Sequence, residues 1–256
     1  MKIKITRYLI GASFLLIPLA SIAGGVAAGG ATGGPPAITA TTDARIALLA
    51  INPDSLVANM RLAAGMSQQV PAYVSRTGST GGVAGRYLVK ATNIAVLMND
   101  QLLAHRVEYL VSAMAAIQYR NKNGALYTSL PDKKWLDNVK RGTITNVSTS
   151  PWIATAQNLT GLAVAASKLS DPQARTILAR NADWVVNTTK SLTIVDWVKM
   201  AGGEHTGMAR ALILASKVTG NNSYLKTADY FRKAAETNPA AFAREQLVAS
   251  AHLLLS

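Results

Sequence analysis

The sequence contains no cysteine. This absence excludes disulfide bonds, a thiol nucleophile and thiolate-bound zinc, so the folded chain must rely on its apolar core for stability. Histidine is almost as scarce, because His105, His205 and His252 are the three in the sequence. So few imidazoles argue against a histidine-rich metal site. We therefore expect neither a metal ion nor a cofactor.

Acidic residues are also few. Thirteen Asp and Glu stand against 26 Lys and Arg, which gives a formal net charge of +13. Such an excess favours polyanionic partners, and an acidic polysaccharide or an anionic envelope surface fits it best. A role of the charge in solubility alone is the alternative. The basic residues are scattered and no nucleic-acid-binding motif accompanies them, so we expect no nucleic-acid partner.

The N-terminus has the pattern of a secretory signal peptide over residues 1–23. A basic start is followed by an apolar stretch from Tyr8 to Leu19 and by small residues that end at Ala23. An uncleaved membrane anchor is the alternative, and no later stretch is apolar enough to span a bilayer. Residues 24–42 contain no charge and are rich in Gly, Ala, Pro and Thr, which predicts a flexible linker. We expect a secreted or periplasmic protein whose folded domain covers residues 43–256.

Apolar residues repeat with a helical period from residue 44 onward. The clearest stripe steps by four, three, four and three residues through Leu103, Val107, Leu110, Met114 and Ile117. Alternation of the β type is absent over any useful length. The sequence therefore predicts an all-α fold.

Turn residues divide the helical region into three hairpins. The turns are residues 98–100, 170–172 and 220–223, and each contains residues that stop one helix and start the next. Turns this short join antiparallel neighbours. The predicted helix pairs are 83–97 with 101–118, 153–169 with 172–187, and 206–218 with 223–236. A further helix opens at Asn52-Pro53-Asp54 and closes at Gly65, and another follows Pro239.

The two helices of each hairpin differ in charge. Lys168 is the one charged residue between Trp152 and Leu169, whereas Arg175 and Arg180 lie on the helix that follows. This difference predicts an inner layer of charge-poor helices wrapped by an outer layer of charge-rich ones. The result is a toroid-like (α/α) array of three or more hairpins, an incomplete (α/α)6 barrel. A second copy of the chain could complete the ring.

Polar and glycine-rich clusters lie where a loop meets the first helix of each hairpin. In a layered array these three points share one rim, where the positive ends of the helix dipoles converge. An arginine, a tryptophan platform and a carboxylate on one rim fit a sugar site. Trp152 as a core residue and Glu204 as a simple helix-start carboxylate are the alternatives. The candidate substrate-binding residues are Trp152, Arg86, Tyr87 and Gly207, and the candidate catalytic residues are Glu204 and, more weakly, His205.

Taken in order, these clusters resemble the N-terminal helical part of the β-L-arabinofuranosidase family of glycoside hydrolases, formerly a domain of unknown function. The resemblance covers about residues 44–252. The helix that opens at Asn52 is similar to the family's first helix, and Gly85-Arg86-Tyr87-Leu88 stands where the family has Gly-His-Tyr-Leu. Pro151-Trp152 resembles the start of its second inner helix, and Glu204-His205-Thr206-Gly207-Met208 the start of its third.

The chain departs from the family pattern at several polar positions. Arg86 replaces a histidine, Ala156-Gln157 replace His-Lys, and Ala209-Arg210 replace Asn-Glu. The family's acid/base glutamate and its zinc-bound cysteine cluster, which includes the nucleophile, lie beyond the matched region. The resemblance therefore implies the architecture and a carbohydrate-related ancestry, without the mechanism.

The sequence leaves three functions open. The first is an exported glycoside hydrolase-like protein that acts on or binds arabinose-containing or related cell-wall polysaccharide. The alternative is a non-catalytic helical module that binds a glycan or a protein. A weaker alternative is a lyase-like protein directed at uronates, with Arg86 on the acidic group.

Overall fold

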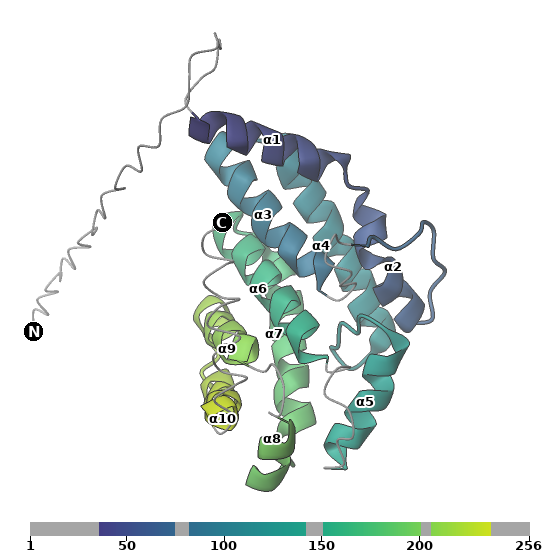
Figure 1. The fold of residues 1–256 in the computed structure, drawn as a ribbon, viewed down its shortest axis with the longest axis vertical. Helices are drawn as coiled ribbons and strands as arrows, with labels where there is room; N and C mark the ends of the chain where they lie inside the picture. The colour runs from purple at the N-terminus through teal and green to yellow at the C-terminus, as the bar shows by residue number, and fades with distance from the viewer. Residues whose placement is uncertain (1–35, 75–81, 142–150, 201–205, 237–256) are drawn as a thin grey trace, which may run out of the picture.

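The computed structural model describes residues 36–74, 82–141, 151–200 and 206–236. Within these ranges it contains ten α-helices and no strand, which confirms the predicted all-α, toroid-like fold (Figure 1). None of the helices described is long and apolar enough to cross a membrane. The helices are α1 (Pro36–Ala50), α2 (Pro53–Ala63), α3 (Val83–Met98), α4 (Gln101–Asn121), α5 (Leu130–Lys140), α6 (Trp152–Lys168), α7 (Pro172–Thr189), α8 (Ile194–Met200), α9 (Thr206–Thr219) and α10 (Ser223–Glu236).

The three predicted hairpins are present as α3–α4, α6–α7 and α9–α10. Their turns use the expected local chemistry. Asp100 Oδ1 accepts hydrogen bonds from the backbone N–H groups of Leu102 (2.9 Å) and Leu103 (3.1 Å), so that it caps α4. Asp171 caps α7 in the same way, with Pro172 in the first turn of the helix. Gly220 closes α9 with φ = 79°, a left-handed conformation that glycine adopts without strain.

The first helices of the hairpins form the inner layer. Helix α6 lies between α3 and α9, and it packs extensively against both (Figure 1). Helices α3 and α6 run parallel, because Gly85 near the start of α3 meets Gly161 while Asn93 further along accepts a hydrogen bond from Lys168 Nζ (2.7 Å). The outer helices α4, α7 and α10 cover this layer, as the charge pattern predicts.

The outer helices are staggered along one another. Gln118, near the end of α4, donates to the backbone carbonyl of Ile177 in the first half of α7 (3.0 Å). In the same sense, Tyr224 at the start of α10 donates to Asp183 Oδ1 in the middle of α7 (2.9 Å). Each outer helix therefore begins beside the body of the preceding one.

Helix α1 corrects the predicted linker. Residues 36–42, which composition assigns to the linker of residues 24–42, form the first half of this helix. The segment after Gly34 is free of glycine and rich in Ala, and contacts further along anchor the helix. Leu48 is buried, Arg45 pairs with Asp100, and the carbonyl of Ile51, just past the helix, accepts a hydrogen bond from Arg106 (2.8 Å). The predicted signal peptide and the helix after Pro239 lie outside the described residues.

Two glycines bring α3 and α6 together at their closest point. A Cβ atom added to Gly85 would lie 2.1 Å from the carbonyl oxygen of Gln157, and one added to Gly161 would lie 2.5 Å from the carbonyl oxygen of Gly85. The two main chains therefore touch with no side chain between them, and this contact fixes the spacing of the inner layer.

All four tryptophans of the sequence belong to one aromatic cluster in the core. Trp152 is at its centre, with ring centroids 5.8 Å from Trp135, 5.9 Å from Trp184 and 5.3 Å from Phe231. The Phe231 ring in turn contacts Trp197 edge to face at 4.8 Å. The cluster joins α5, α6, α7, α8 and α10, and edge-to-face contacts of this kind stabilise a core beyond the area that they bury.

Replacing Tyr224 with Phe is expected to destabilise the protein by about 1–2 kcal/mol at pH 7, because the buried hydroxyl loses its bond to Asp183. Burial and that hydrogen bond raise the pKa of Tyr224 to about 12. The pKa of Tyr224 is higher in the folded protein than in the unfolded chain, where it is near 10, so the protonated phenol stabilises the fold below pH 10. This stabilisation is lost as the pH rises toward 12.

The difference in unfolding free energy between wild type and Tyr224→Phe should therefore shrink between pH 10 and pH 12. Denaturant unfolding at several pH values measures it. A difference that stays constant up to pH 12 would contradict the raised pKa of Tyr224 and its hydrogen bond to Asp183.

Candidate functional site

The predicted rim corresponds to the N-terminal ends of α3 and α6. Arg86 lies in the first turn of α3 and is partly buried, and its Nη1 donates a hydrogen bond to Gln157 Oε1 of α6 (2.7 Å). Burial lowers the pKa of the Arg86 guanidinium, while Tyr73 acts in the opposite direction. The structure thus brings together two residues, Arg86 and Gln157, that replace polar residues of the family pattern.

Gly82 permits this pair to form. It caps α3 in a left-handed conformation (φ = 67°), and an added Cβ would lie 1.9 Å from Gln157 Oε1. A side chain at position 82 would therefore both strain the backbone and displace Gln157.

Two of the candidate substrate-binding residues lie in the core. Trp152 has none of its surface exposed, and Tyr87 is 3% exposed. The Tyr87 hydroxyl donates to the backbone carbonyl of Leu48 (3.3 Å), and burial raises its pKa. For Trp152 this placement favours the alternative of a packing residue, because a ring surrounded by other aromatic rings has no free face on which a sugar can stack.

The remaining candidates lie at the start of α9. Gly207 is exposed in the first turn of this helix. Glu204 and His205, the two candidate catalytic residues, lie outside the described residues. The site geometry therefore rests on the side chains of α2, α3 and α6 and on the segment that contains Tyr73.

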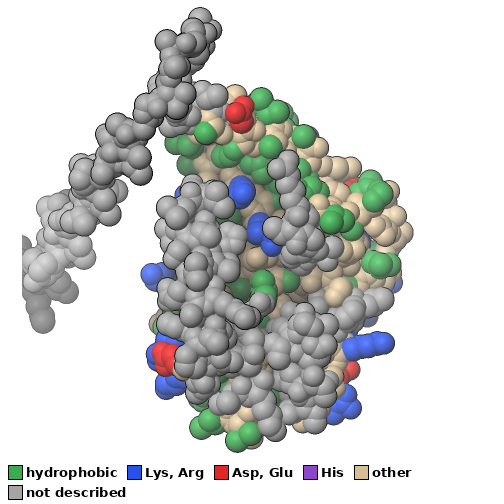
Figure 2. All heavy atoms as spheres, viewed as in Figure 1, with side chains coloured by type: hydrophobic (Ala, Val, Ile, Leu, Met, Phe, Trp, Pro, Cys, Tyr) green, Lys and Arg blue, Asp and Glu red, His purple; other side chains and the backbone are tan. Residues whose placement is uncertain are grey.

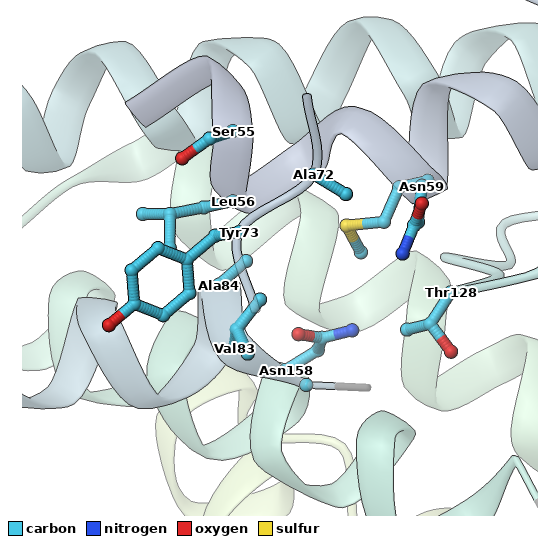
Figure 3. A pocket seen from close by; sticks show the side chains of 11 residues that line it. Ser55, Leu56, Asn59, Ala72, Tyr73, Val83, Ala84, Thr128 and Asn158 are labelled. Atoms are coloured by element: carbon cyan, nitrogen blue, oxygen red, sulfur yellow. The ribbon is translucent and has the colours of Figure 1, made fainter. Parts of the chain in front are cut away.

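A small pocket adjoins the Arg86–Gln157 pair. It lies between α2, the start of α3 and α6, and its volume is about 260 Å³ including the open space at its mouth. Figure 3 shows the amide of Asn158, from α6, between Val83 and Thr128 on one side of the ring of lining side chains, with Asn59 above it and the Tyr73 ring to the left. Asn158 is completely buried.

Sequence reasoning missed this pocket. A usable signal was present, because Asn158 is an amide in the otherwise apolar run that continues through Leu159 and Leu162. A polar side chain on a buried helix face normally has a hydrogen-bond partner, and the sequence pattern alone does not show that Asn158 lacks one.

The zinc centre implied by the family resemblance does not fit this chain. The sequence has no cysteine, and in the described ranges no three side chains of His, Asp or Glu are placed to hold a metal ion. Several described carboxylates have structural roles, such as the helix caps Asp100 and Asp171 and the partner of Tyr224, Asp183. No carboxylate lines the pocket in the described structure. The described residues of the site can therefore hold a ligand by hydrogen bonds.

The face of the molecule seen in Figure 2 carries dispersed positive charge. Lys and Arg side chains are spread over the visible face and its edges and form no continuous block (Figure 2). This distribution agrees with the scatter of basic residues in the sequence, and it singles out no polyanion-binding patch on the face shown.

The helical region matches a known family over almost its whole length. Residues 37–252 match the family model described as Beta-L-arabinofuranosidase, GH127 catalytic domain. No curated protein matches the chain. The family match includes all ten described helices except the first residue of α1, as well as the Arg86–Gln157 pair.

Proposed function

Since the chain belongs to the β-L-arabinofuranosidase family of glycoside hydrolases, we propose that it is an exported, glycoside hydrolase-like protein that binds arabinose-containing or related cell-wall polysaccharide at the rim of its inner helices. The family match over residues 37–252 carries this proposal. The Arg86–Gln157 pair supports the location, because both side chains offer hydrogen-bonding groups of the kind that recognise sugar hydroxyls. The pattern of the first 23 residues supports export.

Binding is favoured over hydrolysis by the substituted polar positions of the family pattern, where Arg86 replaces a histidine and Ala209-Arg210 replace Asn-Glu. Glycoside hydrolysis normally requires two carboxyl groups on either side of the bond. Glu204 is the one carboxylate proposed at the rim. Hydrolysis with Glu204 as the acting carboxylate is the second candidate, and it rests on the family assignment.

The mature protein is expected to be retained on arabinan without releasing sugar. Replacing Arg86 with Ala should weaken this retention by about tenfold or more, because a charged donor of hydrogen bonds is lost. Affinity electrophoresis in gels containing arabinan measures the effect. Lys217→Ala is the matched control, since Lys217 is exposed in the last turn of α9, far from the inner-helix N-termini, and should leave retention unchanged.

Glu204→Gln decides between the two candidates. Under the binding proposal this variant is retained like wild type and neither protein releases sugar from arabinan or aryl arabinofuranosides. Turnover by wild type that Glu204→Gln abolishes would establish hydrolysis instead. Absence of both retention and turnover across a panel of plant and bacterial polysaccharides would overturn the proposed function.

A further inference from the structure

The pocket beside the Arg86–Gln157 pair has a lining of mixed polar and apolar residues and no charge among the described ones. Leu56 and Met60 of α2 and Val83 of α3 line it together with the Tyr73 ring, and Asn158 lies between Val83 and Thr128 (Figure 3). Ser55, Asn59 and Thr128 add further polar groups. A backbone hydrogen bond from Tyr73 N to Ser55 O (2.9 Å) holds the Tyr73 segment against α2. The pocket is therefore built from elements that are fixed to each other.

The Asn158 amide is fully buried, and neither its Nδ2 nor its Oδ1 has a hydrogen-bond partner among the described residues. A buried amide without partners is costly, and native proteins rarely keep one without a reason. Asn158 lines a pocket that opens to the surface, and a group that enters must displace the side chains that cover the amide before it reaches the donor and the acceptor. This amide is the feature that points to a ligand.

The lining of the pocket indicates what kind of ligand fits. None of the described residues that line it is charged. The start of α3 at Gly82 and Val83 would attract an anion through its dipole, but no cation is among the described lining residues, and the nearby Arg86 guanidinium is engaged with Gln157. A hydroxyl group both donates and accepts, and it matches both atoms of the amide. The enclosed part of the pocket is narrow, with room for a group about the size of a water molecule.

We propose that this pocket recognises one hydroxyl group of a neutral sugar, held by Asn158 as donor and acceptor. The inference rests on the proposed function and names the residue that selects neutral sugars over uronates. The position of the pocket supports the proposal. Gln157 directly precedes Asn158 in α6, and Gly82, which lies against the Gln157 side chain, also lines the pocket. A glycan bound at Arg86 and Gln157 thus has this pocket directly beside it.

Replacing Asn158 with Leu tests the proposal through two opposed effects. Leucine has nearly the same size and removes the unpaired amide, so the melting temperature should stay the same or rise by roughly 2–4 °C. Retention on arabinan should fall by about tenfold or more. Asn181→Leu is the matched control, because Asn181 is equally buried, has an amide without described partners, and does not line the pocket. It should change stability in the same direction and leave retention unchanged.

Titration with free L-arabinose and with galacturonate separates the possible failures. The side-chain amide signal of Asn158, assigned by its absence in Asn158→Leu, should shift with arabinose and not with galacturonate in NMR spectra of the wild-type protein. If wild type and Asn158→Leu are retained equally, the pocket has no part in binding while the proposed function stands. If arabinose shifts the signal but no polysaccharide is retained, the pocket proposal stands and the polysaccharide function fails. A shift with galacturonate alone, or with neither sugar, overturns the pocket proposal.

Discussion

Replacing Gly85 with Ala is expected to prevent α3 from packing in its native position against α6 and to destabilise the protein by about 3 kcal/mol or more. The added methyl group would lie 2.1 Å from the Gln157 carbonyl oxygen and 2.6 Å from the Asn158 backbone nitrogen. These atoms belong to the main chain of a helix interior and cannot move aside as a side chain can. Thermal unfolding followed by circular dichroism should show a melting temperature lower by roughly 6–12 °C.

Gly220→Ala provides the control for this experiment. An added Cβ at Gly220 meets no atom within 4 Å, so this change tests only the cost of a left-handed conformation (φ = 79°). That cost is about 1 kcal/mol. Equal effects of the two substitutions would show that α3 can separate from α6 without penalty, and the close contact would then have no structural importance.

Replacing Trp152 with Ala is expected to destabilise the protein by about 3–5 kcal/mol, since it removes the largest side chain at the centre of the aromatic cluster. The rings of Trp135, Trp184 and Phe231 would lose their common neighbour. The near-ultraviolet circular dichroism of the folded protein should therefore weaken as its melting temperature falls.

Tyr119→Ala is the corresponding control. Tyr119 is an aromatic residue of α4 with 80% of its surface exposed, and its loss should change stability by less than about 0.5 kcal/mol. A Trp152→Ala protein as stable as wild type would contradict the core placement. Because the expected effect is structural, reduced glycan binding by Trp152→Ala would not identify Trp152 as a sugar platform, and Arg86→Ala is the better probe of the rim.

The hairpins could be predicted because the residues that define them act locally. Asp171 and Pro172 start α7, and Gly220 ends α9, through interactions with residues at most a few positions away. The layers could be predicted as well, because the charge of a helix surface reflects how much of it is covered. Similar local chemistry starts α8. The Thr193 backbone N–H donates to the Asp196 carboxylate, and the Asp196 backbone N–H donates to the Thr193 hydroxyl, so this pair could have predicted the helix.

The candidate site was harder to predict because its geometry depends on contacts between distant segments. Nothing near Trp152 in the sequence shows that Trp135, Trp184 and Phe231 surround it. The pairing of Arg86 with Gln157 likewise depends on the closeness of α3 and α6, which two glycines permit. Asn158 was overlooked since a lone amide in an apolar helix is informative only when its lack of partners is known.

The parallel contact between α3 and α6 also determines how the chain can reach its fold. Arg86 and Gln157 are 71 residues apart in the sequence, and Asn93 and Lys168 are 75 apart. Each hairpin, in contrast, joins helices through a turn of a few residues and can form on its own local contacts. Formation of the inner layer must close a loop of about 75 residues, so its entropic cost falls on docking of hairpins that have already formed. We therefore expect the glycine contact to form after the hairpins, in a nonlocal step of folding.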